Sequence, residues 1–485
     1  MLDIQKRLTN SFYALLSLPA TAMGFALSVQ ISALSWILAT KYGLAIDEIG
    51  LVWAAGPIAG ILGQVVVGVI SDKVWFWNGR RRPFMFIGGV VAALMLLALP
   101  NIGVISASMG FDGVLGVAIA VALTLDLAIN VSFNPTRSVI ADVTPEGVAR
   151  TKGYTWMQMV SGTFGVLAYA IGAIWSNYLL IYVGVGLVLL FSLVPPFFIE
   201  EPKSLSGDGE DADEGLGGFS VAQILQSIRP LWGFMVYAVY GMTVRLAEID
   251  VAGYWVEIAC LVLTAALMLE SLLKSEVGKS REEAGMIGFK KVLAAHSFTW
   301  IGIQTMFIYM FAFVQYRMPG LDDMDMGRVV SISFLILNAV GALVPVLLLE
   351  PITERIGRVR THMLSMFVMA GAFLAIALVG TSATVIYLLM AVAGIGWGAT
   401  VSLPFAIMSV KVDQSRMGLY MGLFNLSVVL PQLVASLGVG AALNVAPNKT
   451  LVFMICAGTL LVSALAWLLV RENEEEEAGV GALHH

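Results

Sequence analysis

Long apolar runs are the feature of this sequence that most constrains its fold. About fourteen segments are each apolar enough to cross a lipid bilayer, which takes about 20 residues of helix. They lie near 13–39, 48–71, 84–102, 114–139, 153–176, 178–199, 229–244, 252–273, 293–316, 327–350, 361–380, 384–409, 417–443 and 450–470. Because lipid offers no partner to backbone polar groups, such segments must be helical, and the sequence predicts an all-α integral membrane protein.

The composition agrees with a surface that faces lipid. Hydrophobic residues make up 59% of the chain and charged residues only 12%, about half the share found in soluble domains. The net charge is -6 and the basic residues are scattered, so no nucleic-acid partner is expected. Cys260 and Cys456 both lie in apolar runs, which argues against a disulfide framework.

The basic residues predict the orientation of the spans. With the N-terminus in the cytoplasm, nearly all of the 27 Lys and Arg residues fall in cytoplasmic loops. The exceptions are Lys41, Arg245, Arg317, Arg328 and Lys449 on the outside, and Arg137 within a helix. The positive-inside rule therefore predicts two cytoplasmic termini. The start lacks a cleavage site and is interpreted as cytoplasmic. We expect a plasma membrane location, meaning the inner membrane in a Gram-negative bacterium.

The spans group as six, two and six around an acidic, Gly-rich stretch, SLSGDGEDADEGLGG at 204–218, which is typical of a flexible linker. We expect a six-helix bundle (1–200), a cytoplasmic linker (201–228), two extra helices with a connecting segment (229–292), a second six-helix bundle (293–471) and an acidic tail (472–485). The final His484 and His485 are interpreted as a tag remnant.

Two loops repeat one pattern. Segments 68–84 (GVISDKVWFWNGRRRPF) and 350–363 (EPITERIGRVRTHM) both place an acidic residue, a Gly and clustered Arg after a span. The pattern resembles the major-facilitator signature, whose two halves form a parallel repeat with the substrate site near the midplane. Paired charges here can lock one conformation, which rocking must break. Alternatively, the arginines only anchor the topology. The predicted gating residues are Asp72, Arg80, Arg81, Arg82, Asp142, Arg150, Glu354 and Arg358.

Asp126 is the clearest ionisable residue at membrane depth, and such residues are functional candidates by default. Asn130 and Asn134 follow at steps of four and Arg137 at eleven, which returns to within about 20° on a helix. These residues form a polar stripe, and Pro135 can kink its helix. An apolar setting disfavours a charged carboxylate, which suits a proton carrier. A structural carboxylate is the alternative. Arg137 suits either a substrate hydroxyl or an ion pair with Asp142.

Amide and aromatic side chains within the spans suit the hydroxyls and ring faces of a sugar. Singly, they serve equally as contacts between membrane helices or as interfacial anchors. The predicted substrate-binding residues are Gln30, Gln64, Asn130, Asn134, Arg137, Gln158, Gln304, Trp397 and Asn425. His296 lies at the inner end of a span, where we expect a structural role.

No motif indicates catalysis. The sequence has no nucleophile elbow, P-loop or metal-ligand spacing, so we predict neither an enzyme nor a metal or cofactor beyond the coupling proton. GIGWG at 394–398 lies within a span, where glycines permit close helix packing.

Several blocks resemble the sucrose transporter family, which comprises plant sucrose-proton symporters and their animal and bacterial relatives within the major facilitator superfamily. They are GFALSVQIS (24–32), WAAGPIAGILGQVVVGVISD (53–72), GRRRPF (79–84), LDLAIN (125–130), RSVIAD (137–142), GWGATVSLPFAI (396–407) and GLFNLSVVLPQLVAS (422–436). The resemblance implies proton-driven import of an alpha-glucosidic disaccharide, sucrose or maltose. It makes Asp126 the expected proton carrier, and Arg137 and Asp142 match the arginine and aspartate that follow.

This chain departs from the resemblance in two places. The loop at 39–50 lacks the histidine of plant members, and the two helices at 229–273 have no counterpart in twelve-helix members. Two other functions stay open, since fold alone does not fix a substrate. One is a facilitator or exporter of another polar solute, and the other is a membrane sensor that does not transport. We expect the chain to act as a monomer in the lipid bilayer.

Overall fold

The computed structural model describes residues 3–61, 75–77, 79–145, 148–202, 221–247, 249, 251, 253–412 and 417–472. Over these residues the chain is helical, and its one isolated β-bridge joins Phe76 and Gly79. Eleven of the described helices are long and apolar enough to cross a membrane. The chain is therefore a multi-pass, all-α membrane protein.

The count of fourteen spans stays a prediction. The last expected run corresponds to a shorter apolar helix, α20 (Leu451–Trp467), and the first extra helix, α11 (Trp232–Leu246), has 15 residues. The second expected run, 48–71, is described only as far as residue 61.

The chain forms two compact units. Unit 1 comprises Met1–Gly209 and Pro319–Leu335, and unit 2 comprises Glu210–Met318 and Ile336–His485. One helix, α14 (Asp323–Val344), begins in unit 1 and ends in unit 2. The other helices of unit 1 are α1 (Asp3–Lys6), α2 (Asn10–Thr40), α3 (Ile46–Trp53), α5 (Arg82–Ala98), η1 (Leu99–Asn101), α6 (Ile102–Met109), α7 (Leu115–Val143), α8 (Val148–Ile174) and α9 (Asn177–Phe198).

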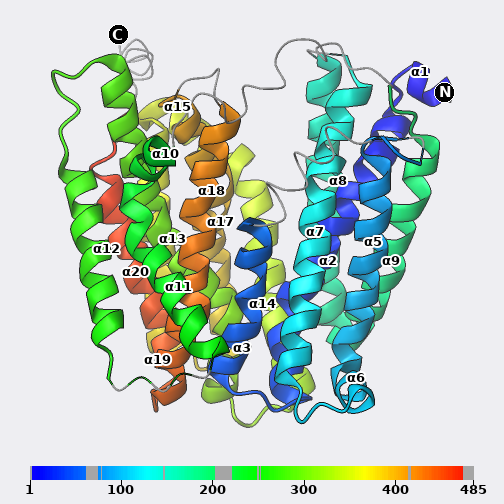
Figure 1. Ribbon diagram of the computed structural model, residues 1–485, viewed down its shortest axis with the longest axis horizontal. Helices are drawn as coiled ribbons and strands as arrows, with labels where there is room; N and C mark the ends of the chain where they lie inside the picture. The colour runs from blue at the N-terminus through cyan, green and yellow to red at the C-terminus, as the bar shows by residue number, and fades with distance from the viewer. Residues whose placement is uncertain are drawn as a thin grey trace. The chain divides into compact units, whose positions relative to one another are not determined.

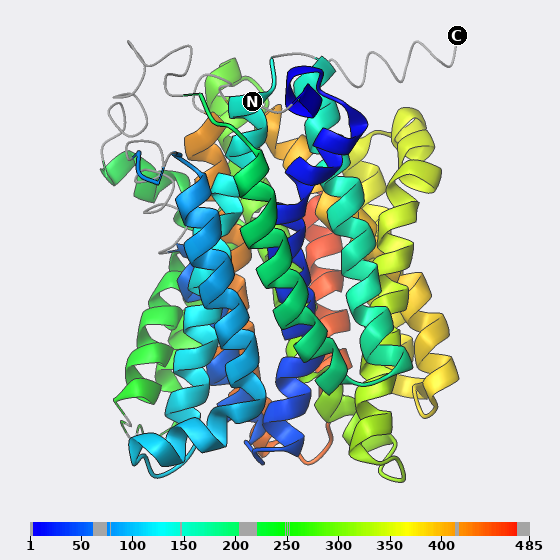
Figure 2. The ribbon, with the colours of Figure 1, turned by 90° about the vertical axis from the view of Figure 1, so that its right-hand side faces the viewer.

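Unit 2 opens with the extra segment, whose helices are α10 (Val221–Ser227), η2 (Arg229–Leu231), α11 and α12 (Trp255–Leu273). Its remaining helices are α13 (Arg281–Arg317), η3 (Pro345–Leu349), α15 (Glu350–Ile356), α16 (Arg358–Val379), α17 (Ala383–Ser409), α18 (Met417–Val434), η5 (Ala435–Val439), α19 (Gly440–Val445) and α20. Figures 1 and 2 show that the long helices within each unit run roughly parallel.

The packing inside each unit follows the sequence repeat. In unit 1, α2 packs on α8 and α9, and α5 packs on α7 and α9. In unit 2, α13 packs on α18 and α20, and α16 packs on α17 and α20. Counted from the start of each half, these are the same partners in the same order, as a parallel repeat requires. The two helices that open the halves, α2 and α13, are the most deeply buried of the described spans.

Glycines set the closest helix contacts, including those of the GIGWG segment. A Cβ atom on Gly394 would lie 2.6 Å from the Cβ of Val340, and one on Gly396 would lie 2.5 Å from the Cβ of Met369. No side chain fits at either distance. The segment therefore permits close helix packing, as the sequence indicates for glycines inside a span.

The first half of α14 is bound into unit 1 by a small polar cluster. The Ser331 hydroxyl lies 2.8 Å from that of Ser32 and donates to Oδ1 of Asn177 at 3.1 Å. The indole N–H of Trp36 donates to the carbonyl oxygen of Asp323 at 2.7 Å. These contacts join α14 to α2 and α9, and all four side chains other than that of Asp323 are buried.

Candidate functional site: a buried carboxylate and an arginine network

The carboxylate of Asp126 lies near the middle of α7 and is buried, with 6% of the residue exposed. The side-chain N–H of Gln30, on α2, donates to its Oδ2 at 3.0 Å. Gly56 lies beside the carboxylate, since a Cβ there would be in van der Waals contact with the same oxygen at 3.4 Å. Among the residues that the structure describes, Asp126 forms no ion pair.

Gln30 places a second buried acceptor beside this carboxylate. Its side-chain oxygen is buried and has no hydrogen-bond partner among the described residues. Buried polar atoms are nearly always satisfied, so this oxygen is a candidate acceptor for a ligand hydroxyl. The Asp126 carboxylate can take up a proton, and the Gln30 oxygen can accept a hydrogen bond from a ligand.

The other described residues of the predicted polar stripe on α7 are more exposed than Asp126. The amide of Asn130 is half-buried and donates to the backbone oxygen of Asp126 at 2.8 Å. The side chain of Asn134 lies outside the described residues. Arg137 is exposed, and its guanidinium lies 4.6 Å above the ring of Phe133. The guanidinium is a cation with donors in a fixed fork, which suits ligand oxygens.

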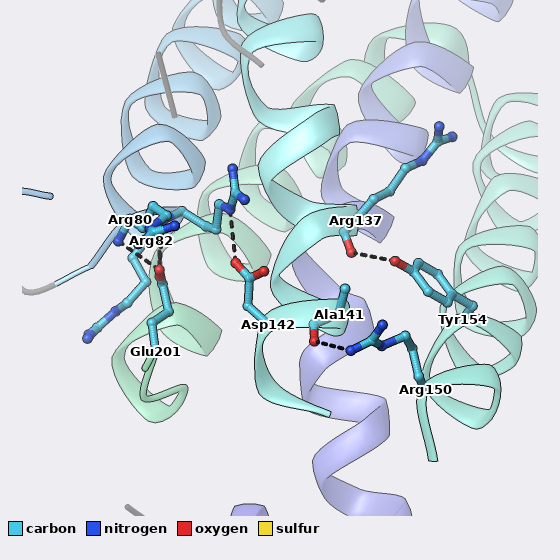
Figure 3. A network of polar contacts seen from close by, with 9 residues as sticks. Arg80, Arg82, Arg137, Ala141, Asp142, Arg150, Tyr154 and Glu201 are labelled. Atoms are coloured by element: carbon cyan, nitrogen blue, oxygen red, sulfur yellow. Dashed lines mark hydrogen bonds and ion pairs between the residues drawn. The ribbon is translucent and has the colours of Figure 1, made fainter. Parts of the chain in front are cut away.

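Asp142 pairs with Arg81 and not with Arg137. The two side chains of the Arg81–Asp142 ion pair are 3.0 Å apart and almost fully buried. Figure 3 shows the side chain of Arg137 pointing away from Asp142. Of the two roles that the sequence left open for Arg137, the geometry favours the one that does not involve Asp142.

Glu201 organises the arginine loop at the start of α5. Its two carboxylate oxygens accept the backbone N–H groups of Arg80, Arg81 and Arg82 at 2.7, 2.8 and 2.8 Å (Figure 3). A helix N-terminus favours an anion in this position. Gly79 permits the contact, since a Cβ there would lie 2.9 Å from Glu201. The sequence analysis did not single out Glu201, whose only signal is its place just after a span.

Arg150, at the start of α8, holds the end of α7. Its guanidinium donates to the carbonyl oxygens of Ala141 and Thr144 at 3.2 and 3.3 Å (Figure 3). Basic side chains commonly satisfy the last carbonyls of a helix in this way. Three predicted gating residues, Arg81, Asp142 and Arg150, therefore surround one helix end. The predicted gating residue Asp72 lies outside the described residues.

The second half repeats the carboxylate cap. Glu472 accepts the backbone N–H groups of Val359 and Arg360 at 2.6 and 3.4 Å, at the start of α16. It thus does for α16 what Glu201 does for α5, and sequence reasoning missed it as well. Of the predicted gating residues in this half, Glu354 is exposed and Arg358 is half-buried.

Aromatic and polar side chains form a second cluster, which lies in unit 2. The indole N–H of Trp397 donates to the side-chain oxygen of Asn338 at 3.1 Å, and the ring of Phe307 packs edge-on at 5.5 Å. Trp300 lies 6.3 Å from Trp397 and donates its indole N–H to Nε2 of His296 at 2.9 Å. We call these five residues the aromatic cluster.

His296 is a further residue that sequence reasoning placed in a structural role. Its ring stacks on Phe424 of α18 at 5.0 Å, and its Nδ1 is buried without a partner among the described residues. Rings and polar tips together can bind the faces and hydroxyls of a sugar. Gln304, a predicted binding residue, is buried on the same helix, α13.

The other predicted binding residues are more dispersed. Gln158 is exposed on α8 and Asn425 is half-buried on α18. Gln64 lies outside the described residues. Over the part of the chain that the structure describes, no group of three or more His, Cys, Asp or Glu residues is arranged to hold a metal ion.

Comparison with known families and relatives agrees with this architecture. The sequence model of the Major Facilitator Superfamily matches residues 16–436. Sucrose transport protein SUC4 of Arabidopsis thaliana is 24% identical over 458 residues, which cover 87% of this chain and 82% of that protein. General alpha-glucoside permease of Schizosaccharomyces pombe is 28% identical over 174 residues, covering 32% of this chain and 31% of the permease. Proton-associated sugar transporter A of Mus musculus is 29% identical over 139 residues, covering 28% and 18%.

Solved structures share the fold at low sequence identity. The nucleoside transporter NupG, as its D323A mutant, matches with a TM-score of 0.65 and 14% identity over 95% of this chain and all of that one. The POT family transporter PepTSo matches with a TM-score of 0.65 and 11% identity over 95% of this chain and 98% of its own. The resemblance to sucrose transporters that the sequence blocks indicate is thus confirmed at the level of sequence relatives, and the solved structures establish the fold alone.

Proposed function

This chain belongs to the Major Facilitator Superfamily and is a membrane transporter, not an enzyme; from this premise we propose that it imports an alpha-glucosidic disaccharide, sucrose or maltose, together with a proton. Its sequence relatives include a sucrose transport protein and an alpha-glucoside permease. The single observation that carries the coupling is the buried Asp126, whose charge is met by one amide, from Gln30, and by no described cation.

Asp126 is proposed as the group that carries the proton. A buried carboxylate without a countercharge costs least when it is neutral, so its ionisation is tied to how much water reaches it. Alternating access changes that hydration twice in each cycle. The proton therefore binds when the site opens to the side of higher proton activity and leaves on the other side, which is what symport requires.

Candidate sugar-binding residues are proposed in each unit separately. In unit 1, Gln30, Asn130 and Arg137 offer amide and guanidinium groups to sugar oxygens, and the aromatic cluster in unit 2 offers ring faces. Asn134, Gln64, Gln158, Gln304 and Asn425 remain proposed binding residues from the sequence. Because protein amides both donate and accept, they match hydroxyls that do the same.

The conformational lock is proposed to lie in the arginine network. Arg81, Asp142 and Arg150 hold the end of α7, and Glu201 holds the start of α5. Together with Asp72, Arg80 and Arg82, and with Glu354 and Arg358 in the second half, they form the proposed gating set. We place the protein in the plasma membrane with both termini cytoplasmic, acting as a monomer.

Uptake by purified protein in liposomes tests the substrate class. We expect labelled sucrose or maltose to enter under an inward proton gradient and to be displaced by the other disaccharide. Uridine and a dipeptide serve as competitors from other solute classes. No uptake of either sugar would mean that the protein carries another polar solute, as would inhibition of sugar uptake by uridine or the dipeptide at the same concentration. The variant Trp397→Phe should raise the KM for sugar. Phenylalanine has a smaller ring and lacks the indole N–H that donates to the side-chain oxygen of Asn338.

A further inference from the structure

The packing that the two halves share leaves α11 and α12 without a counterpart. These two helices pack closely on each other. The hydroxyl of Tyr240 donates to Glu257 at 3.2 Å, and Gly233 faces Thr264 with no room for a side chain. The pair also contacts the transport core, since α11 packs on α18 and η5 and α12 packs on α13. In the contact with η5, a side chain of α11 donates to a backbone carbonyl oxygen.

The segment η5 is a π turn inside an otherwise α-helical stretch, between α18 and α19. A π turn widens the helix by one residue and is uncommon outside functional regions. Pro431 lies one turn before it and has no backbone N–H to donate, which already weakens the ladder there. A π turn shifts the hydrogen bonds from i→i+4 to i→i+5 and leaves a carbonyl oxygen without its usual partner in the helix, so carbonyls of the turn are open to partners from outside.

Two side chains from other helices supply those partners. The hydroxyl of Tyr309, on α13, lies 3.2 and 3.0 Å from the carbonyl oxygens of Ala435 and Ser436. The guanidinium of Arg245, on α11, donates to the carbonyl oxygen of Leu437 at 2.9 Å. Three successive carbonyls of the π turn are therefore bound by side chains, and one of the two donors comes from an extra helix.

One face of α11 packs against this turn. Tyr237, Gly241 and Arg245 are four residues apart and so share one face of the helix. A Cβ on Gly438 would lie 2.7 Å from the Tyr237 hydroxyl, and one on Gly241 would lie 3.5 Å from Leu437. The Tyr237 hydroxyl fills the space that a side chain at position 438 would need. The fit thus depends on residues from both helices.

We propose that α11 braces the π turn of α18, with Arg245 and Tyr237 as positioning residues. The brace fixes the course of α18, the helix that carries Phe424, against which His296 stacks, and Asn425. A guanidinium is always charged and keeps its donors in a rigid fork, so it suits a permanent contact with a carbonyl. The brace itself needs no assumption about the substrate; only its effect on uptake rests on the proposed function.

Hydrogen exchange of the full-length protein in lipid nanodiscs, without sugar, tests the brace directly. Arg245→Met keeps the length of the side chain and removes the donor. We expect the amides of 435–445 to exchange about ten-fold faster or more, because a charge-assisted hydrogen bond is lost. Arg245→Lys keeps a donor and should restore slow exchange. Arg328→Met removes an exposed arginine, paired only with its neighbour Asp325, and should leave the segment unchanged.

A second pair of variants tests the fit without removing a charge. Gly438→Ala should speed exchange in the same segment, because the new methyl group meets the Tyr237 hydroxyl. Adding Tyr237→Phe removes that hydroxyl and should return exchange toward the wild-type rate. Unchanged exchange in Arg245→Met, or no rescue by Tyr237→Phe, overturns the brace. If exchange is faster in Tyr309→Phe but not in Arg245→Met, the core holds the turn without α11 and the brace is wrong.

The transport consequence is measured separately. Arg245→Met should lower the rate of sugar uptake while the KM for sugar stays within about two-fold, as expected for a residue that acts by positioning a helix. If the wild-type protein moves neither sucrose nor maltose, the proposed substrate is wrong. The exchange experiment then still decides the brace, because it uses no sugar.

Discussion

At the scale of single residues, loss of the Arg81–Asp142 ion pair should lower the stability of the protein most. Both side chains are almost fully buried, and the pair is 3.0 Å long. Arg81→Met leaves a buried carboxylate without its cation, and breaking such a pair typically costs about 3–5 kcal/mol. We expect a clearly lower thermal unfolding midpoint in detergent.

A double variant separates the contribution of the ion pair to stability from the other contributions of its two residues. In Arg81→Met/Asp142→Asn neither charge of this pair is left buried without the other, and replacing both partners is far milder than removing one. The midpoint should recover most of the loss. A double variant that is no more stable than Arg81→Met would mean that Arg81 stabilises the protein through other contacts.

The sequence predicts single residues well only where one position stands out from its own segment. Asp126 is recognisable because it is a carboxylate within an apolar run. Its partner Gln30 lies 96 residues away, and Glu201 lies about as far from the arginines that it caps. Such pairs depend on how helices pack, and hydropathy carries no signal of which helices those are. For the same reason, His296 gave no sign of its stacking on Phe424.

At the scale of elements, the docking of α14 in unit 1 depends on a close approach. A Cβ on Gly327 would lie 2.9 Å from the indole nitrogen of Trp36 and 3.0 Å from the amide nitrogen of Asn177. Gly327→Val should therefore loosen the first half of α14 from α2 and α9. A cysteine placed at Ser331, buried in the wild type, should then react faster with a water-soluble maleimide.

The chain supplies a clean background and a matched control for this labelling. Its two native cysteines, Cys260 and Cys456, are both buried. Gly320→Val makes the same change in the same segment, where a Cβ would meet nothing within 4 Å. Equal labelling rates in Gly327→Val and Gly320→Val would show that the close approach does not hold α14 in place.

Elements were more predictable than their irregularities. Apolar runs mark the spans because lipid demands continuous hydrophobic helices, and the repeated loops at 68–84 and 350–363 reveal the two halves. The π turns at Pro345–Leu349 and Ala435–Val439 left no such mark. A π turn inserts one residue without changing hydropathy, so only its partners, such as Tyr309 and Arg245, reveal it.

At the scale of the whole molecule, the account rests on coupling between sugar and proton. A symporter must not change the side to which it opens while it holds the proton without the sugar, or the gradient would dissipate. Exchange of sugar across the membrane needs no net proton movement, whereas accumulation does. These two modes therefore separate a defect in coupling from a defect in binding or folding, which no structural measurement does.

The decisive measurement compares both modes in proteoliposomes for the wild type, Asp126→Asn and Asp112→Asn. The last makes the same chemical change at an exposed carboxylate in the loop before α7. We predict that the wild type and Asp112→Asn accumulate labelled sucrose or maltose under an inward proton gradient. Asp126→Asn should lose accumulation and keep exchange. Gradient-driven accumulation that survives in Asp126→Asn would contradict the account, because the proton would then travel by another group.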